Sequence, residues 1–119
     1  MKNELLSEFI SLDTNAKVIV LFGGSPKRRD EVIRQLMQLE GVTIIGTLSE
    51  REGIDKLLEH KKVDLVLIGG QYTDEQRIRI RSFVRNNLPV AEITEPGYDY
   101  PYSNEAIFNY VKDKLKLIV

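Results

Sequence analysis

The stretch KVIVLFGGSPKRRDEVIRQLMQLEG, residues 17–41, contains one complete strand-to-helix unit. Between its opening lysine and its first glycine all residues are apolar, which is typical of a strand covered on both faces. After two glycines, Ser25 suits a helix cap and Pro26 suits the first helical position. Apolar residues then recur at helical spacing until the closing glycine. The stretch therefore predicts a strand over 17–22 and a helix over 26–40.

The alternation of strand and helix repeats along the chain. Two capping boxes, Ser49 with Glu52 and Thr73 with Gln76, each predict a helix start after a strand. Parallel βα units follow from this alternation. The right-handed crossover rule then leaves an open doubly wound sheet, because a barrel needs about twice the length. The other predicted strands are 42–47, 63–70 and 89–94, and further helices are predicted over 3–12 and near the C-terminus.

We therefore predict a three-layer, flavodoxin-like α/β fold with a doubly wound parallel sheet. Its expected strand order is 2-1-3-4, with a short or missing fifth strand and an added N-terminal helix. The chain, residues 1–119, is expected to form one domain. Residues 1–14 form the N-terminal helix and lead-in, and residues 16–116 form the core.

The composition limits the classes of function. The chain has a net charge of -1 and no cysteine, which excludes disulfides and thiolate chemistry. A single histidine argues against a metal site built from the usual zinc ligands. The charge gives no field toward nucleic acid, and the longest apolar runs are too short to span a bilayer. Because the N-terminus lacks the apolar region of a signal peptide, we expect a cytoplasmic protein that binds neither membrane nor nucleic acid.

Two predicted strands end in paired glycines, Gly23-Gly24 and Gly69-Gly70. In an open parallel sheet the ligand crevice lies beyond the carboxyl ends of the strands, where the strand order reverses. In the predicted order that point lies between these two strands. The glycine pairs either form the floor of a ligand site or only make tight strand-to-helix turns.

Basic residues follow the first glycine pair. The helix dipole favours negative charge at a helix start, yet Lys27, Arg28 and Arg29 occupy the first turn here. Three cations beside free backbone N–H groups suit an anion. The alternative is a solvated basic patch that Asp30 and Glu31 partly neutralise. The candidate anion-binding residues are Gly23, Gly24, Ser25, Lys27, Arg28, Arg29, Gly69 and Gly70.

The segment GIDKLLEHKKVDLVLIGGQYTDEQ, residues 53–76, resembles the receiver (CheY-like) domain of two-component response regulators. In that family this strand ends in the Asp that accepts the phosphoryl group, and Gly69 stands at that position. The family's first strand ends in acidic residues that hold magnesium. The segment KVIVLFGG resembles that strand but carries Phe22, Gly23 and Gly24 in their place.

The resemblance covers residues 16–116. Thr94 fits the family's switch Thr or Ser, whereas the family's Lys has no match near Pro101. Phosphoryl transfer to Asp needs a carboxylate nucleophile and a metal. The resemblance therefore implies a pseudo-receiver that lacks the phospho-acceptor, has no enzymatic activity and needs no cofactor or metal. It implies a role in signalling or protein–protein interaction, with a protein partner or a second copy of the chain.

A second resemblance lies in GGSPKRR, residues 23–29, which is similar to the G-S-P-R-K phosphate loop of NADPH-dependent FMN reductases. It implies, as an alternative, an anion- or nucleotide-binding protein whose cofactor is FMN or another phosphate-bearing ligand. The activity would then be that of a flavin-binding oxidoreductase. Tyr98, Tyr100 and Tyr102 would either stack on the flavin ring or pack against their own domain.

One predicted helix carries a row of arginines. Arg77, Arg81 and Arg85 recur every four residues and so share a face. Arginine is enriched at protein interfaces, which makes this row a candidate interaction face. The alternative is a solvated helix side on which arginines pair with Asp74 and Glu75.

Two further features concern the edges of the domain. Glu92 lies within a predicted strand, where a charge fits an exposed sheet edge better than a buried position. Residues 117–119 are apolar and are expected to dock on the core or to contact a second copy.

Overall fold

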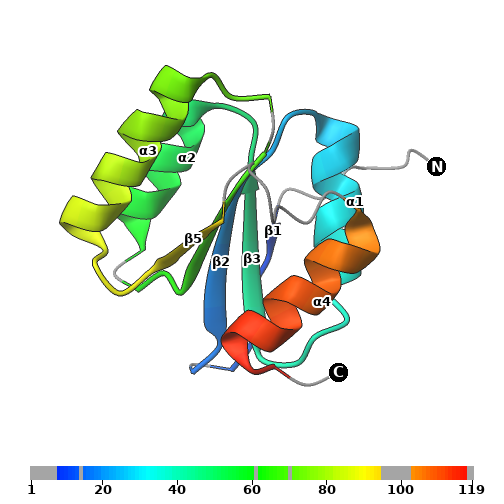
Figure 1. Ribbon diagram of the computed structural model, residues 1–119. Helices are drawn as coiled ribbons and strands as arrows, with labels where there is room; N and C mark the ends of the chain where they lie inside the picture. Colours follow the sequence, from blue (N-terminus) through cyan, green and yellow to red (C-terminus); the bar gives the residue numbers. More distant parts are fainter. Residues whose placement is uncertain (1–7, 14, 61, 70, 95–102, 118–119) are drawn as a thin grey trace.

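The computed structural model describes residues 8–13, 15–60, 62–69, 71–94 and 103–117, and they form a sheet flanked by helices (Figure 1). Each longer strand leads into a helix, as the alternating sequence pattern predicts. In chain order the elements are β1 (Glu8–Phe9), β2 (Lys17–Phe22), α1 (Pro26–Leu36), β3 (Val42–Thr47), α2 (Glu50–Glu59), β4 (Leu65–Ile68), α3 (Asp74–Asn87), β5 (Glu92–Thr94) and α4 (Asn104–Leu115).

The sheet is mixed. Its five strands lie in the order β1-β3-β2-β4-β5. β2 pairs in parallel with β3 on one side and with β4 on the other, and β5 pairs in parallel with β4. β1 is antiparallel to β3. The predicted α/β class is thus confirmed. The prediction of a wholly parallel sheet is wrong, because the N-terminal segment adds an antiparallel edge strand.

The predicted helix over 3–12 is also wrong in its described part. β1 pairs with the middle of β3, and the Ser11 backbone N–H donates to Thr43 Oγ1 at 3.0 Å. The open edge of β3 supplies backbone partners to an extended segment, and Phe9 packs against an apolar cluster in that conformation. Residues 3–7 lie outside the described part of the chain.

Helix α1 ends earlier than its apolar pattern predicts. It ends at Leu36, and residues 37–40 form a turn that leads to Gly41. Gly41 has a φ of 65°, a conformation that glycine adopts at helix ends without strain. Within the described residues, no helix is long and apolar enough to cross a membrane.

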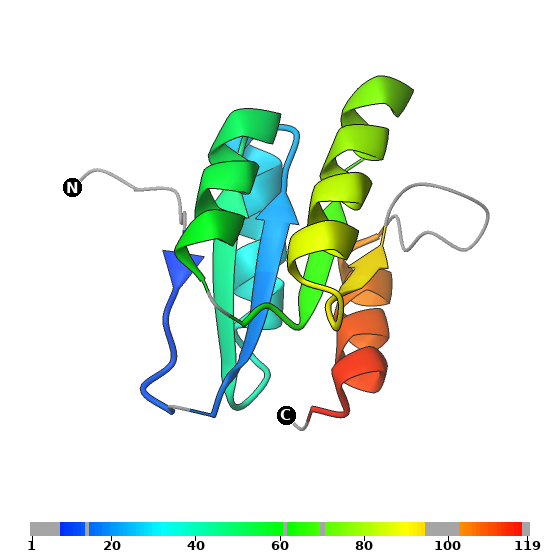
Figure 2. The same ribbon diagram turned by 90° about the vertical axis from the view of Figure 1, so that its left-hand side faces the viewer.

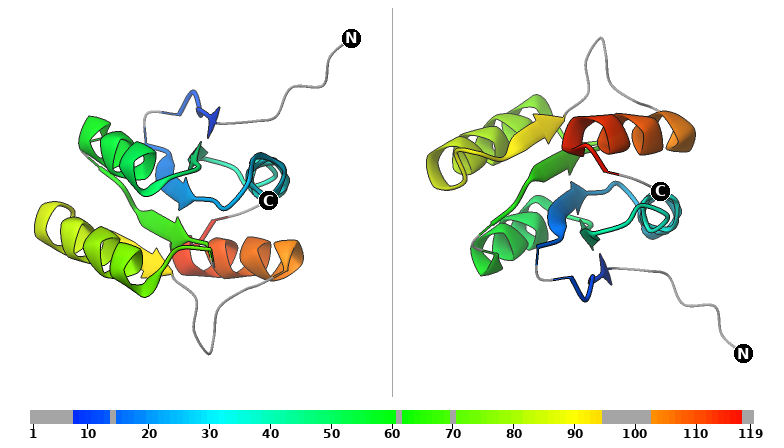
Figure 3. Two further views of the ribbon diagram at one scale, coloured as in Figure 1. Left: turned by 90° about the horizontal axis from the view of Figure 1, so that it is seen from above. Right: turned by 90° about the horizontal axis from the view of Figure 1, so that it is seen from below.

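Helices cover both faces of the sheet, which gives three layers (Figures 2 and 3). Side chains of β2 alternate between the two faces. Ile19 and Leu21 pack in a cluster with residues of α1 and α4, whereas Val20 and Phe22 pack with α2 and α3. All four are buried. A strand covered on both faces needs this continuous apolar run.

Close packing between β2 and α2 depends on Gly53. A Cβ atom there would lie 1.9 Å from Cε2 of Phe22, so the glycine leaves the space that the aromatic ring fills. The edge of the sheet opposite β1 is at β5, the last strand in the order, and Glu92 is exposed there as predicted. Its carboxylate lies 3.6 Å from Lys114 Nζ. At the C-terminus Leu117 is partly buried against the α1/α4 cluster, and residues 118–119 lie outside the described chain.

Candidate functional site

The carboxyl ends of β2 and β4 lie side by side, as the sequence predicts. Phe22 is opposite Ile68, and the Gly69 N–H donates to the Phe22 carbonyl oxygen at 2.8 Å. A Cβ atom on Gly69 would lie 3.0 Å from that same oxygen. Close backbone contact between two strands therefore explains this glycine. Gly70 lies outside the described residues.

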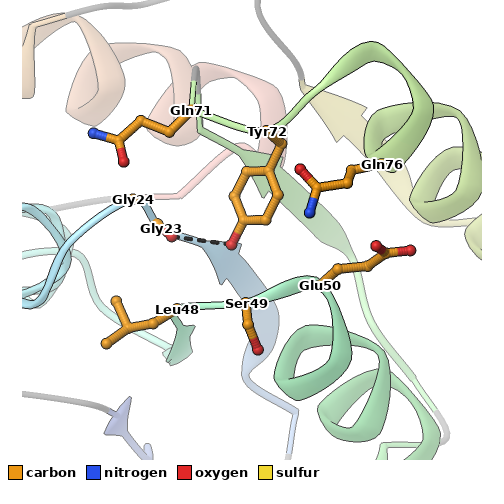
Figure 4. A pocket seen from close by; sticks show the side chains of 8 residues that line it. All are labelled: Gly23, Gly24, Leu48, Ser49, Glu50, Gln71, Tyr72 and Gln76. Atoms are coloured by element: carbon orange, nitrogen blue, oxygen red, sulfur yellow. Dashed lines mark hydrogen bonds between the residues drawn. The ribbon is translucent and has the colours of Figure 1, made fainter.

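Side chains from the loop after β4 cover the other glycine pair. The Tyr72 hydroxyl donates to the Gly23 carbonyl oxygen at 3.0 Å (Figure 4). A Cβ atom on Gly24 would lie 2.6 Å from Cδ of Gln71, so that carboxamide lies directly over the glycine. The Tyr72 ring meets Phe22 edge to face, with ring centroids 6.1 Å apart. The loops after β2 and β4 are thus joined across the strand ends.

A cavity of about 220 Å³ opens beside this junction (Figure 4). It lies at the strand ends, where the starts of α2 and α3 come together with the loops that follow β2 and β4. This is the region where open α/β sheets bind ligands. The lining residues come from three loops and helix starts: Gly23, Gly24, Leu48, Ser49, Glu50, Gln71, Tyr72 and Gln76.

Ser49 and Thr73 cap the two helix starts at the cavity, as the sequence predicts. The predicted reciprocal capping box is present only at the start of α3, because Glu52 accepts from Leu48 and not from Ser49. The Ser49 side chain accepts from the Glu52 N–H at 3.0 Å, and Oε1 of Glu52 accepts from the backbone N–H of Leu48 at 2.7 Å. At the start of α3, Thr73 and Gln76 form a reciprocal capping box. These bonds satisfy backbone N–H groups that would otherwise be unpaired. They also hold the residues around the cavity in place.

Acidic groups set the electrostatics of the cavity. Arg79 donates to both carboxylate oxygens of Glu50, at 2.6 and 2.7 Å, and this hydrogen bonding lowers the pKa of Glu50. Burial raises the pKa of Tyr72 to about 12, with smaller contributions from the charges of Glu52 and Glu50. The Tyr72 hydroxyl therefore stays protonated and can act as a donor at neutral pH.

The predicted cations do not line this cavity. Ser25 caps α1 by accepting from the Arg28 backbone N–H at 3.2 Å, and the Arg28 guanidinium lies 3.5 Å from the Glu31 carboxylate. The stem of Arg29 packs over Gly46 of β3, and Lys27 is exposed. Among the described residues that line the cavity, none is basic. Binding of an anion at Gly23, Gly24, Ser25, Lys27, Arg28, Arg29, Gly69 and Gly70 stays a prediction.

The arginine row of α3 has partners on its own helix and beyond. Arg77 pairs with Asp74, as the solvated alternative predicts. Arg79 pairs with Glu50 of α2 instead of Glu75. Arg77 and Arg81 are half-buried and Arg85 is exposed. A role for Arg77, Arg81 and Arg85 in partner binding stays a prediction.

Two other predicted positions lie away from the cavity. Thr94 is buried, and its hydroxyl is hydrogen-bonded to that of Tyr110 on α4 at 2.8 Å. The loop with Tyr98, Tyr100 and Tyr102 lies outside the described residues. Within the described chain there is no group of three or more His, Cys, Asp or Glu that could hold a metal ion.

Sequence reasoning missed most residues of the cavity. Tyr72 and Gln71 stand directly before a predicted helix cap, and Ser49 is itself such a cap. In a parallel sheet, helix starts that follow adjacent strands lie at the same edge. Two capping boxes, which follow the strands on either side of β2, are therefore the sequence signal for this region.

The chain was compared with protein-family models, with curated proteins and with solved structures, and none of the three comparisons gives a match.

Proposed function

We propose that the chain is a receiver-like domain that binds a protein partner, or a second copy of itself, without being phosphorylated on Asp. One observation carries the proposal. Gly69 follows β4 and lies beside the end of β2, where the receiver family has its phospho-acceptor, and its N–H bonds to the Phe22 carbonyl. The site offers backbone where phosphoryl transfer needs a carboxylate.

The packing around position 69 supports the same conclusion as the presence of glycine there. A side chain at position 69 would begin 3.0 Å from the Phe22 oxygen, and the Tyr72 hydroxyl is already bonded to the Gly23 carbonyl. Acid groups near the strand ends are otherwise engaged: Glu50 with Arg79, and Glu52 with the Leu48 N–H. This arrangement favours a scaffold role over a magnesium-dependent switch.

The first test is phosphorylation. The chain is incubated with a small-molecule phosphoryl donor and Mg²⁺, and its intact mass is measured, with a phosphorylatable receiver domain treated in parallel as the positive control. We expect the mass to stay unchanged. A labile adduct of about 80 Da, the mass of one phosphoryl group, would contradict the proposal.

The second test addresses the partner. Arg85 is exposed on α3 and belongs to the predicted interaction face. We expect Arg85→Glu to weaken self-association, or binding to a protein recovered with the wild-type chain, by tenfold or about 1.4 kcal/mol. Arg51→Glu is the matched control, since it reverses an exposed charge on α2. Equal effects of the two changes would argue against this face.

A further inference from the structure

Tyr72 places a hydrogen-bond acceptor in the cavity at the strand ends (Figure 4). Its hydroxyl proton is donated to the Gly23 carbonyl oxygen at 3.0 Å. The hydroxyl oxygen keeps its lone pairs for another donor. Since the pKa of Tyr72 is raised to about 12, this arrangement persists across the physiological pH range. An incoming ligand therefore meets an acceptor at this position.

Gln76 places a donor in the same cavity. Its Oε1 accepts from the Thr73 backbone N–H at 2.9 Å, and its own backbone N–H donates to the Thr73 side chain at 3.1 Å. The capping box thereby fixes which end of the carboxamide is oxygen. The Nε2 atom therefore points toward Tyr72 and Glu50 (Figure 4). An amide nitrogen can donate a hydrogen bond but cannot accept one.

Charge and size narrow the class of ligand. Of the described residues that line the cavity only Glu50 is charged, and both its oxygens accept from Arg79. The acidic Glu50 and Glu52 disfavour a second negative charge near the Tyr72 hydroxyl. Neither the pairing of Glu50 with Arg79 nor these negative charges oppose the binding of an uncharged ligand. A cavity of about 150 Å³ can hold benzene, so a volume of about 220 Å³ is enough for a single ring.

We propose that this cavity binds a small uncharged ligand through an amide-type edge, with an N–H donor beside a C=O acceptor. The ligand N–H donates to the Tyr72 oxygen, and the ligand carbonyl accepts from Gln76 Nε2. Leu48 and the Tyr72 ring supply apolar walls. A primary carboxamide on a ring and the lactam edge of a nucleobase both have this chemistry.

The test is a titration of the full chain, followed by the backbone amide resonances of Gly23, Gly24 and Tyr72. Nicotinamide represents the carboxamide, uracil represents the lactam, and nicotinate has the ring of nicotinamide with an anionic carboxylate. We expect at least one of the two uncharged probes to shift these resonances, in the millimolar range usual for so small a ligand. Whichever binds more tightly identifies the source. Nicotinate and inorganic phosphate should bind at least tenfold more weakly.

Two variants test the assigned polarity. Gln76→Glu keeps the capping box, because glutamate also fits this position, but it replaces the cavity-facing donor with an acceptor. We expect amide binding to weaken at least tenfold while the melting temperature stays unchanged. Gln38→Glu makes the same change in charge at an exposed turn and should leave binding intact. Tyr72→Phe, which removes the acceptor, should weaken binding by about tenfold.

Three results would overturn the proposal. One is the absence of resonance shifts with both uncharged probes up to their solubility limits. Another is equal binding of nicotinate and nicotinamide, or binding of phosphate at these residues. The third is unchanged binding by Gln76→Glu, or equal losses in Gln76→Glu and Gln38→Glu. The titration needs no protein partner and no phosphoryl donor, so its result is independent of the proposed function.

Discussion

Helices α1 and α2 begin at the same edge of the sheet, and both begin at a serine cap, yet their first turns carry opposite charge. Ser25 and Ser49 accept backbone N–H groups at 3.2 and 3.0 Å. The first turn of α2 contains Glu50 and Glu52, whereas that of α1 contains no acidic residue. The cavity borders α2 and its acids, while the cations of α1 lie outside the lining. The strand ends are therefore flanked by acidic residues at the start of α2 and by basic residues at the start of α1.

The two helices also approach the sheet in complementary ways at their fourth residue. In α2 this residue is Gly53, and the ring of Phe22 from β2 fills the space that it leaves. In α1 it is Arg29, whose stem lies over Gly46 of β3. The glycine lies on the helix in one contact and on the strand in the other. A new Cβ on Gly53 would therefore meet a buried ring, whereas one on Gly46 would meet a flexible stem together with Cδ1 of the buried Ile33.

The largest expected effect is that of Gly53→Ala. The new Cβ would lie 1.9 Å from the fully buried ring of Phe22, so we expect the free energy of unfolding to fall by about 3 kcal/mol. The better helix propensity of alanine, about 1 kcal/mol, offsets only part of a larger packing cost. Urea denaturation with an unchanged m value measures the loss.

Gly46→Ala is the matched change on the α1 side. Its Cβ would meet Arg29 Cγ at 2.7 Å and Ile33 Cδ1 at 2.9 Å. The long Arg29 side chain can move toward solvent, whereas Ile33 is fully buried. We expect a loss of about 2 kcal/mol, smaller than that of Gly53→Ala because the Arg29 part of the contact can relax. Equal losses in the two variants would contradict the difference between the two contacts, because they would show that both respond alike to an added methyl group.

Tyr72→Phe is expected to cost about 2 kcal/mol, because it leaves the buried Gly23 carbonyl without its partner. The folded pKa of Tyr72 is raised from 10.0 to about 12. The stabilising effect of the hydroxyl is therefore complete below pH 10 and is lost as the pH rises through 12. Absorbance titration of phenolate should show one group near pH 12 that is absent from the variant. If the group missing from the variant titrates near the ordinary value of 10.0 instead, the burial assigned to the Tyr72 hydroxyl is contradicted.

Capping substitutions should have a smaller effect. Thr73→Ala and Ser25→Ala each remove a side chain that accepts from a backbone N–H of the first turn, and each is expected to cost about 1 kcal/mol. Thermal unfolding followed by circular dichroism compares them. Ser25→Ala should cost more, since in Thr73→Ala the backbone N–H of residue 73 can still donate to Gln76 Oε1 and part of the capping box remains. A larger loss in Thr73→Ala would reverse the order expected from the two caps.

The smallest effect is that of Glu50→Gln. Arg79 lowers the folded pKa of Glu50 from its ordinary value of 4.5. The ion pair therefore adds stability above pH 4.5, and this contribution disappears as the pH falls through the lower folded value. We expect wild type and variant to differ slightly at pH 7 and to converge in acid. In an Arg79→Gln background the substitution should have no such pH dependence, and its persistence there would point to another partner of Glu50.

The central part of this fold could be predicted from sequence because burial on both faces leaves an unmistakable apolar run. The run before Gly23 marks β2, and the capping boxes at Ser49 and Thr73 mark the starts of α2 and α3 as the structure has them. The N-terminal strand could not be predicted, since two residues such as Glu8 and Phe9 contain no periodicity. Their conformation is set by the open edge of β3.

Only part of the candidate site could be predicted from the sequence. The glycines mark the strand ends, and their meeting follows from parallel pairing of β2 with β4. The direction in which the cations of α1 point depends on packing: Arg29 lies over Gly46, a contact between residues far apart in sequence. Likewise Tyr72 becomes a cavity residue only through its bond to Gly23. Contacts of this kind are tertiary and leave no local pattern.

The most direct test of the account concerns bare backbone at the ends of β2 and β4. Mg²⁺ with beryllofluoride, a mimic of phosphoryl aspartate, is added to the full chain, and the amide resonances of Gly23, Gly24 and Gly69 are recorded. We expect these resonances to stay where they are, because no carboxylate is present at these positions to accept the mimic. A saturable shift of the three glycines that requires both Mg²⁺ and beryllofluoride would contradict it.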